Sequence, residues 1–190
     1  MSTHANPKLT PEEYLARERA AEYKSEYYGG EIFAMAGAGP IHIRLGLNLE
    51  RILYSQLPTS CSVYVSEMRV FVPSTELYTY PDVVVTCGEK FLDGTLDTLL
   101  NPTLIAEVLS PSTEAYDRGR KFEHYQTIES FQQYMLIAQD RIRVDLYTRQ
   151  AGGGGWLMQS ATQLSDTVEI ASIGCRISVD KLYERVEFVK

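Results

Sequence analysis

The chain has 190 residues, of which 44% are hydrophobic and 23% are charged, an ordinary balance for a globular domain. Its net charge of −7 excludes a generally basic nucleic-acid-binding surface, because phosphate binding depends on clustered Lys and Arg, but it allows a local basic patch. No apolar run approaches the roughly 20 residues that cross a bilayer, and the first residues lack the pattern of a secretory signal. We therefore expect no membrane association.

The three cysteines, Cys61, Cys87 and Cys175, are scattered and form no C-x-x-C pair. An odd, dispersed set predicts neither a disulfide framework nor a thiolate zinc site, and it fits a reducing cytoplasm. The three histidines also lack metal-ligand spacing. Soft-metal chemistry is therefore disfavoured, and metal sites made of oxygen ligands stay open.

The first part of the chain is predicted to hold two helices separated by a short strand. Thr10 suits a helix cap, Pro11 suits the first helical position, and the acids that follow favour the positive end of the helix. In the second helix, apolar residues recur at helical spacing. The predicted elements are a helix over 10–24, a turn at Gly29-Gly30, a strand over 31–36 and a helix over 41–56 whose core face is Ile41, Leu45, Leu49, Ile52 and Leu53.

After the second helix, β signals dominate. Continuous apolar runs rich in Val, Tyr and Phe are typical of strands that are covered on both faces. Strands are predicted over 62–72, 80–87, 103–109, 133–138, 141–148, 156–160 and 168–171, and helices over 117–130 and 179–185. Thr113 and Asp117 are alternative caps for the helix over 117–130. Gly152–Gly155 is predicted to be a loop rather than a phosphate-binding motif.

This order of elements predicts an α/β fold, with a mixed β-sheet flanked by helices. We expect a single domain over 1–190, in which residues 10–150 form the core and residues 151–190 form an antiparallel, β-rich extension.

Two carboxylates stand where apolar residues are expected. Asp82 follows Pro81 and directly precedes Val83-Val84-Val85, while Glu107 lies inside the next apolar strand. If these strands pair, both acids project into one cleft, where two buried charges would repel each other unless a cation joins them. Carboxylates without His or Cys select a hard ion such as Mg²⁺ or Mn²⁺. The alternatives are an edge residue or ion pair for Glu107 and ordinary turn chemistry for Asp82.

A lysine follows on the next helix. Asp117, Lys121, Tyr125 and Ile128 share one helical stripe, and the last two should face the protein body, so Lys121 should point inward as well. An inward ammonium group needs an anion nearby. The partner is either Asp117, as a simple surface ion pair, or a metal-bound water or phosphate at an active site.

These residues carry a family resemblance. "PD" at 81–82, Glu107 in the next strand and a nearby Lys resemble the PD-(D/E)XK restriction-endonuclease-like superfamily. The segments "EYYGGEIFAMAG", "YPDVVV" and "EVLSPST" resemble, more specifically, the Uma family of predicted endonucleases, long catalogued as domains of unknown function. In the general pattern the lysine stands two residues after the Glu, where this chain has Leu109, so Lys121 must reach the site from the helix.

The resemblance implies a restriction-endonuclease-like core and a divalent-metal-dependent endonuclease that cleaves nucleic acid, with DNA as the expected substrate. It implies Asp82 and Glu107 as ligands of one or two Mg²⁺ or Mn²⁺ ions, Lys121 as the catalytic lysine, and a homodimer. Supporting roles are expected for Glu31, His42, Asp117 and Tyr125, and contacts to substrate phosphates for Arg118 and Arg120. The alternative is a catalytically inactive nuclease scaffold that serves as a protein-interaction module.

Overall fold

The structure is a computed structural model that describes residues 8–35 and 37–188. Its helical elements are α1 (Pro11–Ala20), α2 (Pro40–Tyr54), α3 (Glu114–Tyr116), the π-helical turn η1 (Asp117–Lys121), α4 (Phe122–Gln126), the 3-10 turn η2 (Ala151–Gly153) and α5 (Val179–Leu182). Its strands are β1 (Ser25–Tyr28), β2 (Glu31–Ala34), β3 (Cys61–Val65), β4 (Arg69–Val72), β5 (Leu77–Thr79), β6 (Val83–Cys87), β7 (Thr98–Leu99), β8 (Leu104–Leu109), β9 (Gln133–Ala138), β10 (Val144–Arg149), β11 (Trp156–Ala161), β12 (Thr167–Ile170) and β13 (Cys175–Ser178).

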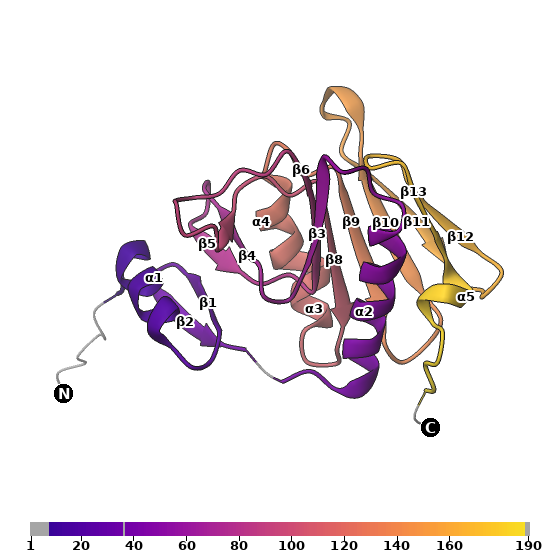
Figure 1. Cartoon of the computed structure of the whole chain (residues 1–190), viewed down its shortest axis with the longest axis horizontal. Coiled ribbons are helices and arrows are strands. Elements are labelled where there is room, and N and C mark those ends of the chain that lie inside the picture. The colour runs from indigo at the N-terminus through magenta and orange to yellow at the C-terminus, as the bar shows by residue number, and fades with distance from the viewer. Residues whose placement is uncertain (1–7, 36, 189–190) are drawn as a thin grey trace.

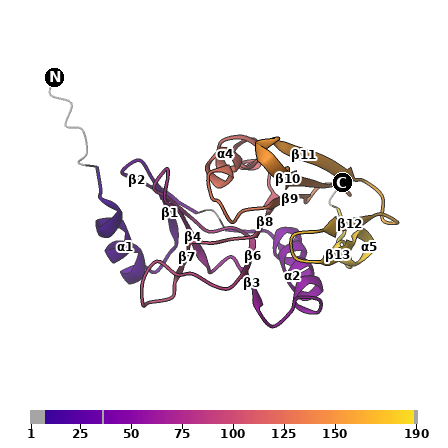
Figure 2. The same cartoon turned by 90° about the horizontal axis from the view of Figure 1, so that it is seen from above.

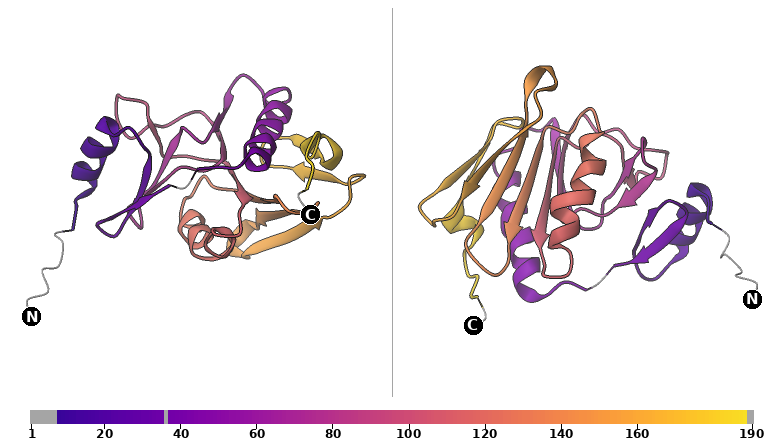
Figure 3. Two further views of the ribbon diagram at one scale, coloured as in Figure 1. Left: turned by 90° about the horizontal axis from the view of Figure 1, so that it is seen from below. Right: turned by 180° about the vertical axis from the view of Figure 1, so that it is seen from behind.

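A six-stranded mixed sheet forms the centre of the molecule, in the order β11-β10-β9-β8-β6-β3. Its β8–β9 pair is parallel and its other pairs are antiparallel. Helix α2 covers one face of this sheet, and α3, η1 and α4 cover the other (Figures 1 and 3). Both faces are therefore buried, which explains the continuous apolar runs of its inner strands.

Alternation along β8 decides which side chains meet which helix. Leu104, Ala106 and Val108 pack in the core that contains α2. Ile105 and Leu109 pack in the core that contains α4. Because side chains alternate along a strand, Glu107 also lies on the α4 face.

A second, five-stranded sheet has the order β2-β1-β5-β4-β7 and carries α1 on its outer side (Figure 2). The cap and the start of α1 are confirmed: Thr10 and Glu13 form a capping box in which each side chain binds the other's backbone N–H. The predicted extension of this helix to residue 24 is wrong, because the backbone becomes extended at Ala21 and then enters β1. Of the strand predicted over 31–36, residues 31–34 form β2, and Ala36 lies outside the described residues.

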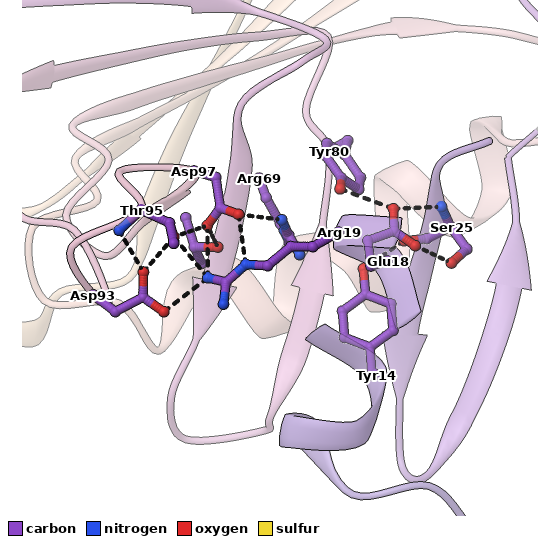
Figure 4. A network of polar contacts seen from close by, with 10 residues as sticks. Tyr14, Glu18, Arg19, Ser25, Arg69, Tyr80, Asp93, Thr95 and Asp97 are labelled. Carbon is purple, nitrogen blue, oxygen red and sulfur yellow. Dashed lines mark hydrogen bonds and ion pairs between the residues drawn. The ribbon is translucent and has the colours of Figure 1, made fainter. Parts of the chain in front are cut away.

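A polar network holds α1 against this sheet (Figure 4). The Arg19 guanidinium donates to the carboxylates of Asp93 and Asp97 at 2.7 and 2.8 Å, and the buried Arg69 donates to Asp97 at 3.1 Å. The Glu18 carboxylate accepts from the Tyr80 hydroxyl at 2.9 Å. Glu18 also accepts hydrogen bonds from the N–H and hydroxyl of Ser25 at the start of β1, so the network ties β1 to α1.

Two expectations for the middle of the chain are wrong. The strand predicted over 62–72 is two strands in different sheets, β3 and β4, because a turn at Ser66–Met68 interrupts it without a Gly or Pro to mark it. The helix predicted over 117–130 begins earlier, at Glu114, contains a π-helical turn and ends at Gln126. Of the two alternative caps, Thr113 is the one that precedes the first helical residue, although its side chain makes no capping hydrogen bond.

The expectation that no disulfide forms is also contradicted, since Cys61 and Cys87 are bonded to each other. They are direct cross-strand partners at the ends of β3 and β6, a pairing that only the register of the two strands reveals. Cys175 is a free, buried thiol.

The C-terminal strands are integrated with the core. Strand β11 supplies the edge of the central sheet, while β12 and β13 form a hairpin. Residues of this hairpin and of α5 pack in the same hydrophobic core as α2. Asn48 of α2 also donates to the carbonyl of Leu182 at 2.9 Å.

Among the residues that the structure describes, every helix is too short or too polar to cross a membrane.

Helix α2 offers a matched test of this packing. We expect Leu49→Ala to lower the free energy of unfolding by about 2–5 kcal/mol, because Leu49 is fully buried between α2 and the sheet. Leu47→Ala, two residues earlier on the exposed side of the same helix, should cost less than about 0.5 kcal/mol. Urea unfolding measures both, and equal losses would contradict the packing described here.

Candidate active site

Asp82 lies directly before β6, in the position that the sequence predicts. Pairing between β6 and β8 stops at Val83 and Ala106, so the backbone of β8 beyond this point is open to a side chain. The Asp82 carboxylate uses this opening: its Oδ2 accepts from the Val108 N–H at 2.7 Å. Its Oδ1 lies 2.9 Å from Nε2 of His42, in the first turn of α2. Both oxygens of Asp82 are therefore held in place.

Glu107 lies beside Asp82 and is almost completely buried. Its Oε2 faces the Asp82 N–H at 3.4 Å. Its Oε1 accepts from the Tyr125 hydroxyl at 3.0 Å and pairs with Lys121 Nζ at 2.9 Å. The two acids thus approach each other from neighbouring strands, and the lysine and tyrosine come from the helical segment that crosses behind them.

Lys121 points inward from the π-helical turn and is only 6% exposed. Besides Glu107, its ammonium group faces Glu26 at 3.5 Å and Asp117 at 3.7 Å. A π-helical turn is rare and is often found at functional sites, because it redirects a side chain locally. Here the turn begins at Asp117 and ends at Lys121, and both side chains are buried.

Acidic groups outnumber basic groups in this cluster. The carboxyl groups of Glu26, Glu107 and Asp117 face one ammonium group, and Asp82 lies beside Glu107. Burial, reinforced by the neighbouring Asp82 and Asp117, raises the pKa of Glu107 despite Lys121, and burial likewise raises the pKa of Asp117. Burial opposes the charge of Lys121, but Glu107 and its other anionic neighbours raise the pKa of the ammonium well above its ordinary value. These anionic neighbours therefore favour the charged form of Lys121.

The donor set fits a hard divalent ion. Within residues 8–35 and 37–188, no three His, Cys, Asp or Glu side chains form a ready-made metal cluster. Asp82 and Glu107 still provide two neighbouring carboxylates in a cluster where acidic side chains outnumber the single lysine. Mg²⁺ is commonly bound by one or two carboxylates, with water and substrate phosphates as the remaining ligands.

Leu109 explains why the lysine comes from the helix. It lies on the same face of β8 as Glu107, but its side chain is buried in the hydrophobic core beside α4. A lysine at this position would have to replace an apolar core residue. Lys121 instead brings its ammonium group to Glu107 from the covering segment.

Glu26 belongs to the cluster, although sequence reasoning missed it. It lies on β1, where it accepts a hydrogen bond from the Thr79 hydroxyl of the neighbouring strand β5. The sequence signal is the segment "EYYGGEI", which begins with Glu26, although the resemblance points to its second acid, Glu31. Because Tyr27 packs against α1, alternation turns Glu26 to the opposite face, toward Lys121.

Three other predicted residues are not brought into the cluster. Glu31 is exposed on β2, and within the described chain no hydrogen bond or ion pair links its carboxylate to these residues. Arg118 is neutralised by Glu114 at 2.8 Å and by Asp145 at 2.9 Å. The Arg120 guanidinium lies over the ring of Tyr28, 5.4 Å from its centre. The structure therefore brings together Asp82, Glu107, Lys121, His42, Asp117 and Tyr125 from the predicted set.

Comparisons with known proteins show which proteins this chain is similar to. The chain is 38% identical over 183 residues to the uncharacterized protein slr1290 of Synechocystis sp., covering 96% of this chain and 95% of that one. It is 43% identical over 152 residues to the uncharacterized protein sll1609 of the same organism, covering 79% and 85%. The crystal structure of "a putative nuclease belonging to DUF820" from Anabaena variabilis matches with a TM-score of 0.73 at 18% identity, over 94% of this chain and 99% of that chain.

The structural match confirms the predicted fold, a mixed α/β architecture with helices flanking mixed sheets. The family model Uma2, described as "Putative restriction endonuclease", matches residues 11–180, nearly the whole chain. The predicted family is thereby confirmed: this chain belongs to the Uma2 family.

Proposed function

We propose that this protein is a divalent-metal-dependent endonuclease that hydrolyses phosphodiester bonds of nucleic acid, with DNA as the substrate that the family description favours. One observation carries the proposal. Asp82, Glu107 and Lys121 come from three separate elements and meet at one largely buried point, where Lys121 contacts Glu107 and Asp82 lies against both Glu107 and Val108. Buried ionisable groups with shifted pKa values are concentrated at functional sites, which supports this reading of the cluster.

Asp82 and Glu107 would hold one or two Mg²⁺ or Mn²⁺ ions, with the Val108 carbonyl as a further oxygen ligand. Such an ion activates water and neutralises charge on phosphate oxygens. His42 orients Asp82 through its contact with Oδ1, and the Val108 N–H fixes Oδ2. The two acids thus present their carboxylates in a fixed arrangement, which limits reorganisation when an ion binds.

Lys121 acts as a fixed cation. Since its neighbours raise its pKa, its ammonium group stabilises the negative charge that develops on a phosphate rather than accepting a proton. Tyr125 and Asp117 support the site through their contacts with Glu107 and Lys121.

A second candidate function is that of a non-catalytic scaffold for protein interaction. It is favoured by one observation: the carboxylate oxygens of Asp82 and Glu107 already have hydrogen-bond or ion-pair partners within the protein. A cluster satisfied in this way can persist without a metal. Homodimerisation stays a prediction from the family resemblance. A cytoplasmic location also stays a prediction, but the Cys61–Cys87 disulfide removes the cysteine argument for it.

Calorimetric titration with Mn²⁺ separates the two candidates. We expect saturable binding to the wild type and at least about tenfold weaker binding to Glu107→Gln, because the amide removes a charged ligand. The control is Glu169→Gln, which removes an equally charged but exposed carboxylate on β12 and should bind Mn²⁺ as the wild type does. Identical binding by the wild type and Glu107→Gln would contradict a metal site at Glu107.

Catalysis is tested by a plasmid-nicking assay in the presence of Mn²⁺. Asp82→Asn and Lys121→Ala should each lower the nicking rate by about 10²-fold or more, since each removes charge that the reaction needs. Lys181→Ala, which removes an exposed lysine on α5, is the matched control and should leave the rate unchanged. If the wild type cleaves neither duplex nor single-stranded DNA nor RNA with any divalent ion, the scaffold is the better description.

A further inference from the structure

Glu26 lies on β1 of the second sheet, and its carboxylate extends to the cluster around Lys121 and Glu107. Its carboxylate accepts from the Thr79 hydroxyl and faces the Tyr80 N–H at 3.5 Å, so it is held by the last residue of β5 and the residue after it. Its Oε1 lies 3.5 Å from the Lys121 ammonium. The remaining contacts of the cluster come from the central sheet and the helices that cover it.

The proposed metal site gives Glu107 two competing roles. Its carboxylate is the closest anion to Lys121, at 2.9 Å, and it is also a proposed ligand of the cation. When the Glu107 carboxylate binds a divalent ion, less of its negative charge balances the ammonium group of Lys121. The ion also repels this ammonium group. A buried ammonium group without a partner is costly, so Lys121 must then be held by another anion.

We propose that Glu26 is a positioning residue that holds Lys121 when the Glu107 carboxylate is engaged by a divalent cation. This inference rests on the proposed function. Glu26 is better suited to the task than Asp117, which is farther from the ammonium, at 3.7 Å. Burial also raises the pKa of Asp117, which disfavours its charged form. The side chain of Asp117 is 5% exposed, whereas the side chain of Glu26 is 16% exposed and keeps more contact with water.

The consequence is a coupling between Glu26 and metal binding that passes through Lys121. Without the Glu26 charge, Lys121 competes more strongly with the metal for Glu107. Metal affinity should then fall even though Glu26 is not itself a ligand. If Lys121 is removed, this competition disappears, and Glu26 should lose its influence.

A double-mutant cycle on Mn²⁺ affinity, measured by calorimetry on the full chain, tests this coupling. We expect Glu26→Gln to weaken Mn²⁺ binding by about tenfold in the wild-type background but by less than about twofold in a Lys121→Met background. Glu31→Gln, which removes an exposed acid of the same hairpin, should have no effect in either background. Thr79→Val, which removes the hydroxyl that fixes Glu26, should weaken binding in the same direction as Glu26→Gln and also only when Lys121 is present.

The outcomes are distinct. Unchanged Mn²⁺ affinity in both Glu26→Gln and Thr79→Val would overturn the inference while leaving the proposed metal site intact. An equal loss with and without Lys121 would also overturn it, because Glu26 would then act on the ion directly. Absence of Mn²⁺ binding by the wild type would overturn the proposed function and this inference together. Circular dichroism of each variant verifies folding, and Thr79→Val keeps the test decisive if Glu26→Gln fails to fold.

Discussion

The buried ion pair between Lys121 and Glu107 is the contact on which the candidate site depends. Burying an ammonium group and a carboxylate costs free energy because both lose their hydration. Well-placed partners for each charge reduce this cost. Here the partners come from both sheets, since Glu107 belongs to β8, Glu26 to β1, and Lys121 to the turn that crosses between them. The charges around Lys121 therefore depend on how the two sheets are placed relative to each other.

Strand alternation, strand ends and ion pairs place the side chains of the site. Alternation along β8 turns Glu107 toward the α4 side while its neighbours fill both hydrophobic cores. Strand β6 begins at Val83, so the Val108 N–H of β8 has no strand partner on that side and binds the Asp82 carboxylate instead. The Arg19 and Arg69 contacts with Asp97 hold the outer sheet and its α1 helix in place (Figure 4). Stability and site geometry thus have common structural causes.

Much of the site was predictable because its signals are local. Asp82 and Glu107 interrupt apolar runs, and the stripe through Lys121 marks an inward lysine, so each residue violates a packing rule that its own segment reveals. Glu26 gives no such signal, because its meeting with Lys121 depends on how β1 pairs with β5. The Cys61–Cys87 disulfide was missed for the same reason, since it depends on the register of β3 and β6. Arg118 was predicted to contact substrate phosphate, but it pairs with the buried Asp145, a partner that its own segment does not reveal.

The central claim is that a divalent cation belongs between Asp82 and Glu107, next to a lysine that stays charged. Anomalous diffraction from crystals soaked in Mn²⁺ tests it most directly. The account predicts one or two manganese peaks in contact with the carboxylates of both Asp82 and Glu107, with the Lys121 ammonium still inside the cluster. No peak at saturating Mn²⁺, or peaks only at surface carboxylates away from these two residues, would contradict it.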